Sequence, residues 1–260
     1  MRSTFLITAA AIATAVSAAP ATLQKRATTA QVIETCTVPG TIALTFDDGP
    51  YEYTWDLAET LKKNGVKATF FMNGENWVDV NTQSVQTSAG KKTYKQVIKH
   101  VYDMGHQLGS HTYHHLELAG QSTSKVKSEM TKMETIFRSI IGKNPLYMRP
   151  PAGAYDSNTL KTLGGMGYKA VLWDIDSNDW RYSEISSLSH EQANYKSVIE
   201  KDSKTKPHGH IALHHDVYEK TAEKLVPWVI SYIKSKGTYK FVTVAECLGN
   251  TKGSAYRTKQ

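Results

Sequence analysis

Two histidines, His111 and His115, have a spacing that suits metal binding. They are four residues apart, so on one helical turn or tight loop both imidazoles can face the same point. One carboxylate added to them completes a three-ligand site with open positions for water and substrate. This spacing is common by chance, so the pair alone is weak evidence for a metal.

The adjacent carboxylates Asp47 and Asp48 strengthen that prediction. Neighbouring side chains on a strand point in opposite directions, and two buried aspartates without a cation would repel each other. One can therefore bind a metal ion while the other stays free as a base. The alternative for Asp47 is a turn cap, because Gly49-Pro50 follows it and turns the chain sharply.

Further titratable residues follow other strand-like runs: Arg149, then Asp174, Asp176 and Asp179, then His214, His215 and Asp216. A bound cation polarises a carbonyl and lowers the pKa of water, so a nearby carboxylate can finish the deprotonation. An amine leaves only when protonated, and histidine has a suitable pKa for that step. His215 fits the need, but its neighbour His214 leaves an ambiguity of one position.

The elements that would position these residues alternate along the chain. Short β-branched and aromatic runs occur at 42–48, 68–73, 107–112, 146–150, 170–176, 210–216 and 240–244. Apolar residues at helical spacing occur at 54–64, 94–104, 123–141, 157–166, 192–201 and 221–236. Glycine follows most of these helical patterns, as it does at left-handed helix ends.

This rhythm predicts an α/β fold: a single domain built on a distorted or incomplete (β/α) barrel with about seven parallel strands. An open doubly wound sheet remains the alternative, since periodicity does not report closure. In both architectures reactive side chains gather at the carboxyl ends of the strands.

Five segments resemble the motifs of one known family. They are TFDDGP at 45–50, HTYHH at 111–115, RPPAGAY at 149–155, DSNDW at 176–180 and LHH at 213–215. In order and spacing they are similar to the five motifs of carbohydrate esterase family 4, the NodB-homology polysaccharide deacetylases. The resemblance spans residues 41 to about 246 and is greatest to the secreted chitin deacetylases of fungi.

The resemblance implies a metal-dependent hydrolysis of N-acetyl groups in chitin or its oligomers. Asp48, His111 and His115 would hold one divalent metal, usually zinc, with cobalt as an alternative. Asp47 would be the general base and His215 the general acid. Arg149 would position Asp47, and Asp176 would orient His215. Asp174 and Asp179 are the alternatives to Asp176 in this role.

The same resemblance implies how the acetyl group is held. Leu213 would line the pocket for its methyl group, and Trp180 would be an aromatic wall, with plain core as the alternative. Ala152 stands where many members have an aromatic residue, but its backbone amide can still donate to an oxyanion. Tyr155 is a candidate to fill the neighbouring subsite.

The first residues predict export. Residues 1–18 have the charge, apolar stretch and small residues of a signal peptide, and Lys25-Arg26 marks where a protease could remove a short propeptide, 19–26. The catalytic domain would then be 27–260, secreted to the medium or cell wall as a monomer. A secreted chain with two cysteines usually pairs them, which predicts a Cys36–Cys247 disulfide.

Charge and tail composition exclude other partners. The net charge of +7 is dispersed and forms no stripe interleaved with aromatics, so nucleic acid is not expected. The polar tail after Cys247 argues against a lipid anchor, and no membrane anchor is expected. Alternatives that the motifs leave open are acetylxylan or peptidoglycan as substrate, a chitin-binding protein without turnover, and an iron site for oxygen chemistry.

Overall fold

The computed structural model describes residues 29–257, so the predicted signal peptide and propeptide lie outside the described residues. Its centre is a nine-stranded parallel sheet. The order is β1 (Val32–Ile33), β9 (Lys169–Val171), β8 (Tyr147–Met148), β6 (Gln107–Ser110), β3 (Ala68–Met72), β2 (Thr41–Asp47), β11 (His210–His215) and β10 (Ile175–Asp176). The ninth, β12 (Lys240–Phe241), pairs with the first residues of β2.

The sheet does not close into a full barrel. β1 and β10 stand at the two ends of the strand order, and no pairing joins them within residues 29–257. The predicted incomplete (β/α) barrel is therefore confirmed. Strands β2 and β3 are buried at every residue, which is why their sequences place apolar residues on both faces of the sheet rather than at alternate positions only.

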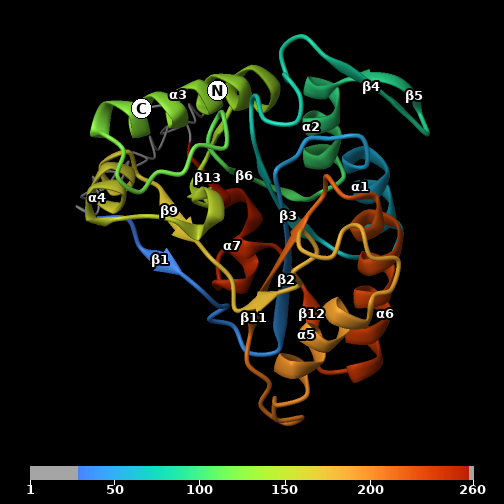
Figure 1. Cartoon of the computed structure of the whole chain (residues 1–260). Coiled ribbons are helices and arrows are strands. Elements are labelled where there is room, and N and C mark those ends of the chain that lie inside the picture. Colours follow the sequence, from blue (N-terminus) through green and yellow to red (C-terminus); the bar gives the residue numbers. More distant parts are fainter. Residues whose placement is uncertain (1–28, 258–260) are drawn as a thin grey trace, which may run out of the picture.

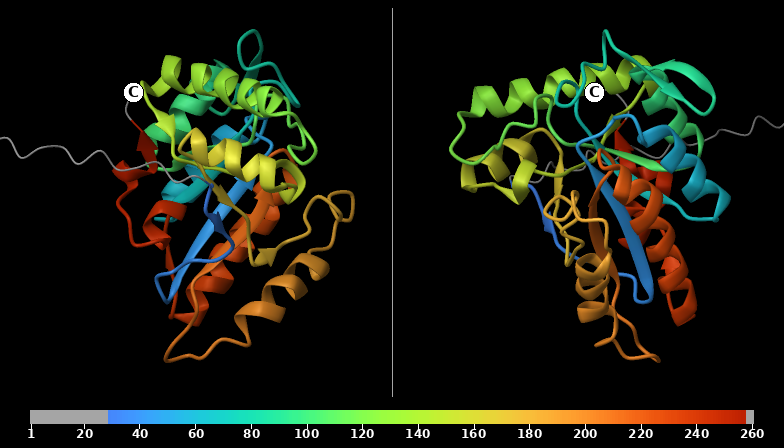
Figure 2. Two further views of the ribbon diagram at one scale, coloured as in Figure 1. Left: turned by 90° about the vertical axis from the view of Figure 1, so that its left-hand side faces the viewer. Right: turned by 45° about the vertical axis from the view of Figure 1, so that its right-hand side comes forward.

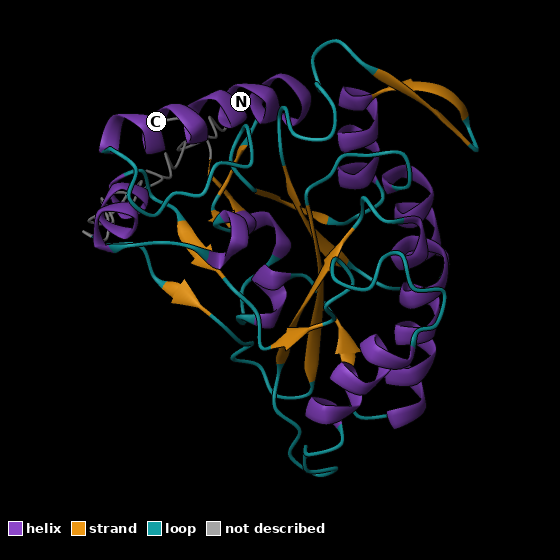
Figure 3. Cartoon of the chain, in the orientation of Figure 1, coloured by secondary structure: helices purple, strands orange, loops and turns teal. Residues whose placement is uncertain are grey.

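Helices cover the outside of this sheet (Figures 1 and 3), with α3 lying along one end and α1 and α6 on one flank. They are α1 (Thr54–Lys63), α2 (Tyr94–Asp103), α3 (Thr123–Ile141), α4 (Ser157–Gly165), α5 (Ser189–Ile199), α6 (Val226–Lys236) and the short α7 (Val244–Cys247). A π-type turn, Thr221–Leu225, leads into α6.

The ends of the helices follow their sequence signals. The hydroxyl of Thr93 accepts from the amide of Gln96, and the Gln96 side chain accepts from Thr93 in return, a capping box that starts α2. Helix α3 has the predicted bounds and ends at Gly142, whose φ of 67° is left-handed. None of the helices in residues 29–257 has both the length and the apolar character needed to cross a bilayer.

One predicted strand, 170–176, is two strands in the structure. β9 ends at Val171 and pairs with β1 and β8, whereas β10 begins at Ile175 and pairs with β11 at the other end of the sheet. Residues 172–174 cross the gap between the two ends. A link this short spans only about 10–14 Å, so the chain itself bridges the gap where the strand pairing stops.

Several short elements were not expected from the sequence. Strand β1 extends the sheet beside β9, and a hairpin of β4 (Ser84–Thr87) and β5 (Gly90–Thr93) projects beyond α1 and α2 (Figure 2). β7 (Asn144–Pro145) pairs with β13 (Tyr256–Arg257) near the end of the chain. Helix α5 begins three residues before its predicted start.

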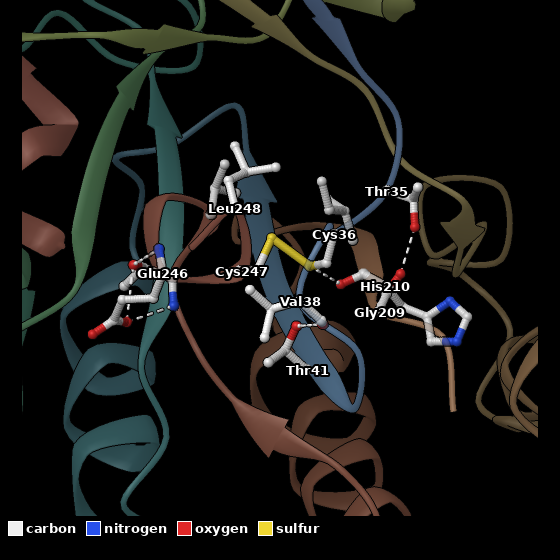
Figure 4. The surroundings of a disulfide bond; sticks show 12 residues. Thr35, Cys36, Val38, Thr41, Gly209, His210, Glu246, Cys247 and Leu248 are labelled. Atoms are coloured by element: carbon white, nitrogen blue, oxygen red, sulfur yellow. Dashed lines mark hydrogen bonds between the residues drawn. A yellow bond between two sulfur atoms is a disulfide. The ribbon is translucent and has the colours of Figure 1, made fainter. Parts of the chain in front are cut away.

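The predicted Cys36–Cys247 disulfide is confirmed (Figure 4). It joins the segment after β1 to the end of α7, with the two Cα atoms 5.0 Å apart. The amides of Thr37 and Val38 both donate to the carbonyl of Cys247 at 3.0 Å, so the two segments are also joined by the backbone. The bond lies near the starts of β2 and β11, away from their carboxyl ends.

Candidate active site

A cavity of 360 Å³ opens at the carboxyl ends of the strands, as the fold class predicts. Residues from all five motifs line it. They are Asp47, Asp48, His111, His115, Ala152, Gly153, Trp173, Asp176, Trp180, Leu213, His215 and Tyr218.

Three of these residues form a set that suits a metal ion. One ligand atom each from Asp48, His111 and His115 lies within 4.8 Å of the others. The Asp48 Oδ1 atom is buried without a hydrogen-bond partner, 3.2 Å from His115 Nε2 and 3.5 Å from His111 Nε2. His111 Nδ1 lies 2.8 Å from the Arg149 carbonyl, which fixes the proton there and leaves Nε2 free as a ligand. Two imidazoles and one carboxylate are the donors of a zinc site.

The electrostatics of Asp48 agree with this set. Burial alone would raise the pKa of Asp48, but the neighbouring His111 and His115 hold it well below its usual range. The carboxylate is therefore in the charged form that a cation requires.

Buried groups hold the loop that carries the two histidines. Glu129 of α3, fully buried, accepts from the amides of Tyr113 at 3.2 Å and His114 at 2.9 Å, and its other oxygen lies 2.9 Å from His114 Nδ1. Asn73, at the end of β3, donates to the carbonyl of Thr112 at 2.9 Å. The loop shape that aims both imidazoles at Asp48 is thus fixed from two sides.

Asp47 is held by a buried guanidinium. Arg149 Nη1 donates to Asp47 Oδ1 at 2.8 Å and to Thr45 Oγ1 at 2.7 Å. Its Nε donates to the carbonyl of Val171, the last residue of β9, and its Nη2 donates to the carbonyl of Leu172, the first residue after that strand. The other oxygen of Asp47, Oδ2, lies 3.7 Å from His111 Nε2, on the metal side of the cavity.

The predicted partner of His215 was wrong. Asp179, not Asp176, lies 2.7 Å from His215 Nδ1, accepts from the His215 amide at 2.8 Å and accepts from the Thr221 hydroxyl at 2.8 Å. The chain turns at Asn178, with a φ of 55°, and this turn returns Asp179 to His215. Asp176 lines the cavity and accepts from the Asn178 amide instead.

This contact sets the protonation of His215. Burial lowers the pKa of His215, but the charge and hydrogen bond of Asp179, with smaller contributions from Asp48 and Asp47, raise it to about 9. The imidazole is therefore protonated at neutral pH and can give up a proton. His215 and Asp47 are register partners at the ends of adjacent strands, so both groups stand on the same side of the sheet.

The neighbouring His214 is excluded as the acid. It is fully buried, with Nε2 2.7 Å from the Tyr195 hydroxyl and Nδ1 3.1 Å from the Thr45 carbonyl. Burial lowers its pKa to about 4. Because alternate residues on β11 face opposite sides, only His215 reaches the cavity.

The sequence matches one known protein family. The family model for polysaccharide deacetylase matches residues 34–171. A chitin deacetylase from Pestalotiopsis sp. is 38% identical over 96% of this chain and 78% of its own length. The chain belongs to the polysaccharide deacetylase family.

Solved structures and other relatives agree with this membership. The structure of the chitin deacetylase from the fungal pathogen Colletotrichum lindemuthianum has a TM-score of 0.81 and 33% identity, covering 89% of this chain and 97% of that one. A peptidoglycan N-acetylglucosamine deacetylase from Listeria monocytogenes is 34% identical over 80% of this chain, which spans 39% of that protein. The protein is a deacetylase, and its fold is that of the family.

Two aromatic wall residues of the deacetylase cavity were missed from the sequence, Trp173 and Tyr218. Aromatic residues are ordinary core residues, so their type gave no signal. Trp180 does line the cavity and is 51% exposed, which excludes a core role, whereas Tyr155 is not among the lining residues. Trp173 lies beside the backbone of Gly153, where a Cβ atom would be 3.1 Å from its ring.

The described non-glycine residues with left-handed backbone all lie at this end of the sheet. They are Asp48, Thr112, His115, Ala152 and Asn178, with φ between 54° and 75°. Such a conformation costs about 1–2 kcal/mol for a residue with a Cβ atom, so the deacetylase concentrates backbone strain where its functional groups meet.

A buried carboxylate supports the turn after the aspartate pair. Asp216, fully buried, accepts from the Gly49 amide at 3.1 Å and from the Thr54 hydroxyl, and burial raises its pKa to about 7. A Cβ atom on residue 49 would lie 2.3 Å from this carboxylate, so only glycine fits there. The glycine of the first motif is therefore required by packing.

Proposed function

We propose that this deacetylase hydrolyses the N-acetyl groups of N-acetylglucosamine units in chitin or chitin oligomers, giving chitosan and acetate. The observation that carries the proposal is the register of Asp47 and His215, a charge-paired carboxylate and a protonated imidazole side by side at one cavity. The similarity to fungal chitin deacetylases supports chitin as the substrate.

Asp48, His111 and His115 would hold one divalent metal, zinc in this proposal. When bound, the cation supplies Lewis-acid chemistry, polarising the acetyl carbonyl and lowering the pKa of water in the site. Asp47 accepts the proton from the attacking water, and Arg149 keeps its carboxylate aimed at that water. The Ala152 amide, at the cavity wall, donates to the oxygen of the tetrahedral intermediate.

The second half of the reaction uses His215. The carbon–nitrogen bond breaks as the imidazolium of His215 passes its proton to the departing amine, leaving the sugar with a free amino group and releasing acetate. Asp179 stabilises the imidazolium before this step and orients the ring. Leu213, almost fully buried, gives an apolar wall for the methyl group of the acetyl.

The substrate is tested by acetate release. Purified protein is offered chitin oligomers, acetylated xylan and peptidoglycan at equal acetyl concentration, and the products are measured by mass spectrometry. We expect release from chitin oligomers above all, with Asp47→Asn as the inactive control. Faster release from peptidoglycan would move the substrate to the cell walls of bacteria, in line with the second group of relatives.

The metal is tested separately. Chelation should abolish activity, and stoichiometric zinc should restore it, with cobalt as a second metal. Metal analysis of Asp48→Asn, His111→Ala and wild type gives a readout that does not depend on turnover: wild type should bind about one ion and the variants should lose it. Full activity after stripping would remove the metal from the mechanism.

Export is the last part of the proposal. Cleavage after Ala18 would give a mature chain that begins at Ala19, and further processing after Arg26 would give one that begins at Ala27. Sequencing the amino terminus of protein recovered from the culture medium decides between them. Size-exclusion chromatography with light scattering tests the expected monomer.

A further inference from the structure

A buried ion pair beside the cavity takes no part in the proposed proton transfers. Lys220 is 9% exposed, and Glu191, in the first turn of α5, is fully buried. The Lys220 Nζ atom lies 2.5 Å from Glu191 Oε1, and neither oxygen of Glu191 has a hydrogen-bond partner within residues 29–257. Burying two charges costs free energy that their attraction recovers only in part, so stability alone does not explain this pair.

Lys220 makes a second contact that the ion pair does not require. Its Nζ donates to the carbonyl of Tyr182 at 2.7 Å, a charge-assisted bond. The next residue, Thr221, donates through its hydroxyl to Asp179 Oδ2 at 2.8 Å. Two consecutive residues that follow β11 thus hold the segment 179–182 at both of its ends.

This segment is a tight turn that carries Trp180. The amide of Tyr182 donates to the carbonyls of Asn178 at 3.3 Å and Asp179 at 3.2 Å. The amide of Trp180 donates to Asp179 Oδ1 at 2.9 Å. The backbone of Trp180 is therefore placed by the two ends of the turn, one held by Thr221 and the other by Lys220.

The side chain of Trp180 depends on that backbone. It lines the catalytic cavity, yet it is 51% exposed, so half of its surface contacts no atom of residues 29–257. A side chain inside a close-packed core is held by its neighbours on all sides. The indole of Trp180 has no such enclosure, and its direction follows the turn that carries it.

We propose that Lys220 is a positioning residue: through the Tyr182 carbonyl it holds the 179–182 turn, so that the indole of Trp180 stays against the substrate in the catalytic cavity. Glu191 keeps the ammonium buried beside this carbonyl. The inference rests on the proposed function, because it concerns the same cavity and the same substrate. Lys220 acts through Trp180 and does not itself touch the reacting atoms.

The test separates the ammonium from the buried carboxylate that faces it. Removing Lys220 alone would leave Glu191 buried without a partner, so Lys220→Met is made in a Glu191→Gln protein. Glu191→Gln by itself keeps the bond to Tyr182 and should leave KM for chitin oligomers nearly unchanged. Adding Lys220→Met should raise KM about two- to ten-fold with kcat nearly unchanged, the range for the loss of one aromatic contact.

A double-mutant cycle tests whether Lys220 acts through Trp180. The Trp180→Ala change already removes the contact that Lys220 supports, so adding Lys220→Met should raise KM no further. All proteins of the cycle carry Glu191→Gln. Increases in KM that multiply would show that Lys220 does not act through Trp180 and would overturn the inference.

The matched control is the ion pair at the other end of α5, where Lys236 Nζ lies 3.7 Å from Glu200. Lys236→Met with Glu200→Gln makes the same two exchanges and should leave KM unchanged. Thermal melts of all variants show whether each one folds. Binding of a chitin oligomer to the Asp47→Asn, Glu191→Gln protein, with and without Lys220→Met, gives a calorimetric readout that needs no turnover.

The outcomes separate this inference from the proposed function. An unchanged KM in folded Lys220→Met, Glu191→Gln protein would overturn the positioning role and leave the function intact. A fall in kcat without a rise in KM would assign the effect of Lys220 to the acid, His215, and would also overturn it. Acetate release from no chitin oligomer by the wild type would overturn the function itself.

Discussion

The two ends of strand β11 carry the same chemical pair in opposite settings. At its start, His210 Nδ1 lies 2.6 Å from Asp174; at its end, His215 Nδ1 lies 2.7 Å from Asp179. The pKa of each imidazole is raised, because in each case the attraction of an aspartate outweighs the lowering effect of burial. By residue type and by charge, the two ends are alike.

The remaining ring nitrogen makes the difference. His210 Nε2 lies 3.1 Å from a second aspartate, Asp202, so both nitrogens are engaged and the ring bridges two carboxylates. His215 Nε2 has no hydrogen-bond partner within residues 29–257, and its ring lines the cavity. A histidine–aspartate pair is a structural clamp when both nitrogens are used and a proton donor when one of them faces an open space.

The largest effect should come from replacing each of the two histidines by alanine in turn. His215→Ala removes the acid and should lower kcat on chitin oligomers by about 10²–10⁴-fold, the range for general acid catalysis, with a nearly unchanged melting temperature. His210→Ala should keep kcat within a few-fold. Equal losses in kcat for the two variants would show that the free ring nitrogen of His215 does not distinguish it from His210.

Asp179→Asn should shift the pH dependence of activity. The proton-donating form of His215 is lost as the pH rises through its raised pKa, so activity falls on the basic side. Removing the charge of Asp179 lowers that pKa, and the basic limb of the pH–kcat profile should move toward neutrality. Asp174→Asn, the matching change at His210, should leave the limb in place, as pH–rate profiles of both variants would show.

The structural clamp at His210 should contribute to the free energy of unfolding. His210→Gln leaves Asp174 and Asp202 without their shared cation and should reduce the free energy of unfolding by about 1.5–3 kcal/mol, the range for hydrogen bonds to charged groups. Urea denaturation at several pH values measures this loss.

The sign of its pH dependence follows from the raised pKa of His210. The contribution of His210 is fully present below its unfolded pKa of about 6.5 and is lost as the pH rises through the folded pKa. The gap between wild type and variant should therefore be wide near pH 5.5 and narrow at high pH. A gap that widens with pH would contradict the clamp.

The smallest effect concerns the strained residues, which all lie at the His215 end. Ala152→Gly removes the Cβ atom that makes a φ of 54° costly but adds flexibility to the unfolded chain, so the net gain should be at most about 1 kcal/mol. A thermal melt detects it, and a looser amide at the cavity wall should lower kcat modestly.

Much of the site could be predicted from residue types in order along the chain. The carboxylates, histidines and arginine follow strand ends, and parallel strands bring their ends together whatever the details of the loops. Asp47, Asp48, His111, His115, Arg149 and His215 meet at one cavity for that reason. The cysteine pairing needed only the count and the expected export.

The misses share a physical cause, the local path of the backbone. The sequence pattern does not distinguish Asp176 from Asp179. The left-handed backbone of Asn178 decides which one reaches His215. The run 170–176 has the residue types of a single strand, and periodicity carries no sign that the chain leaves one end of the sheet and joins the other. Both features depend on tertiary packing that a residue pattern does not record.

The crossing between β9 and β10 is linked to the orientation of Asp47 through Arg149. The guanidinium of Arg149 donates to the carbonyls of Val171 and Leu172, where the strand pairing stops. It also donates to the carboxylate of Asp47 and so fixes its orientation. A shift of residues 171–172 would move the guanidinium and with it the carboxylate of Asp47, the proposed base. The side chain that bridges the break in the sheet thus also belongs to the cavity, so replacing it would disturb the sheet and the cavity together.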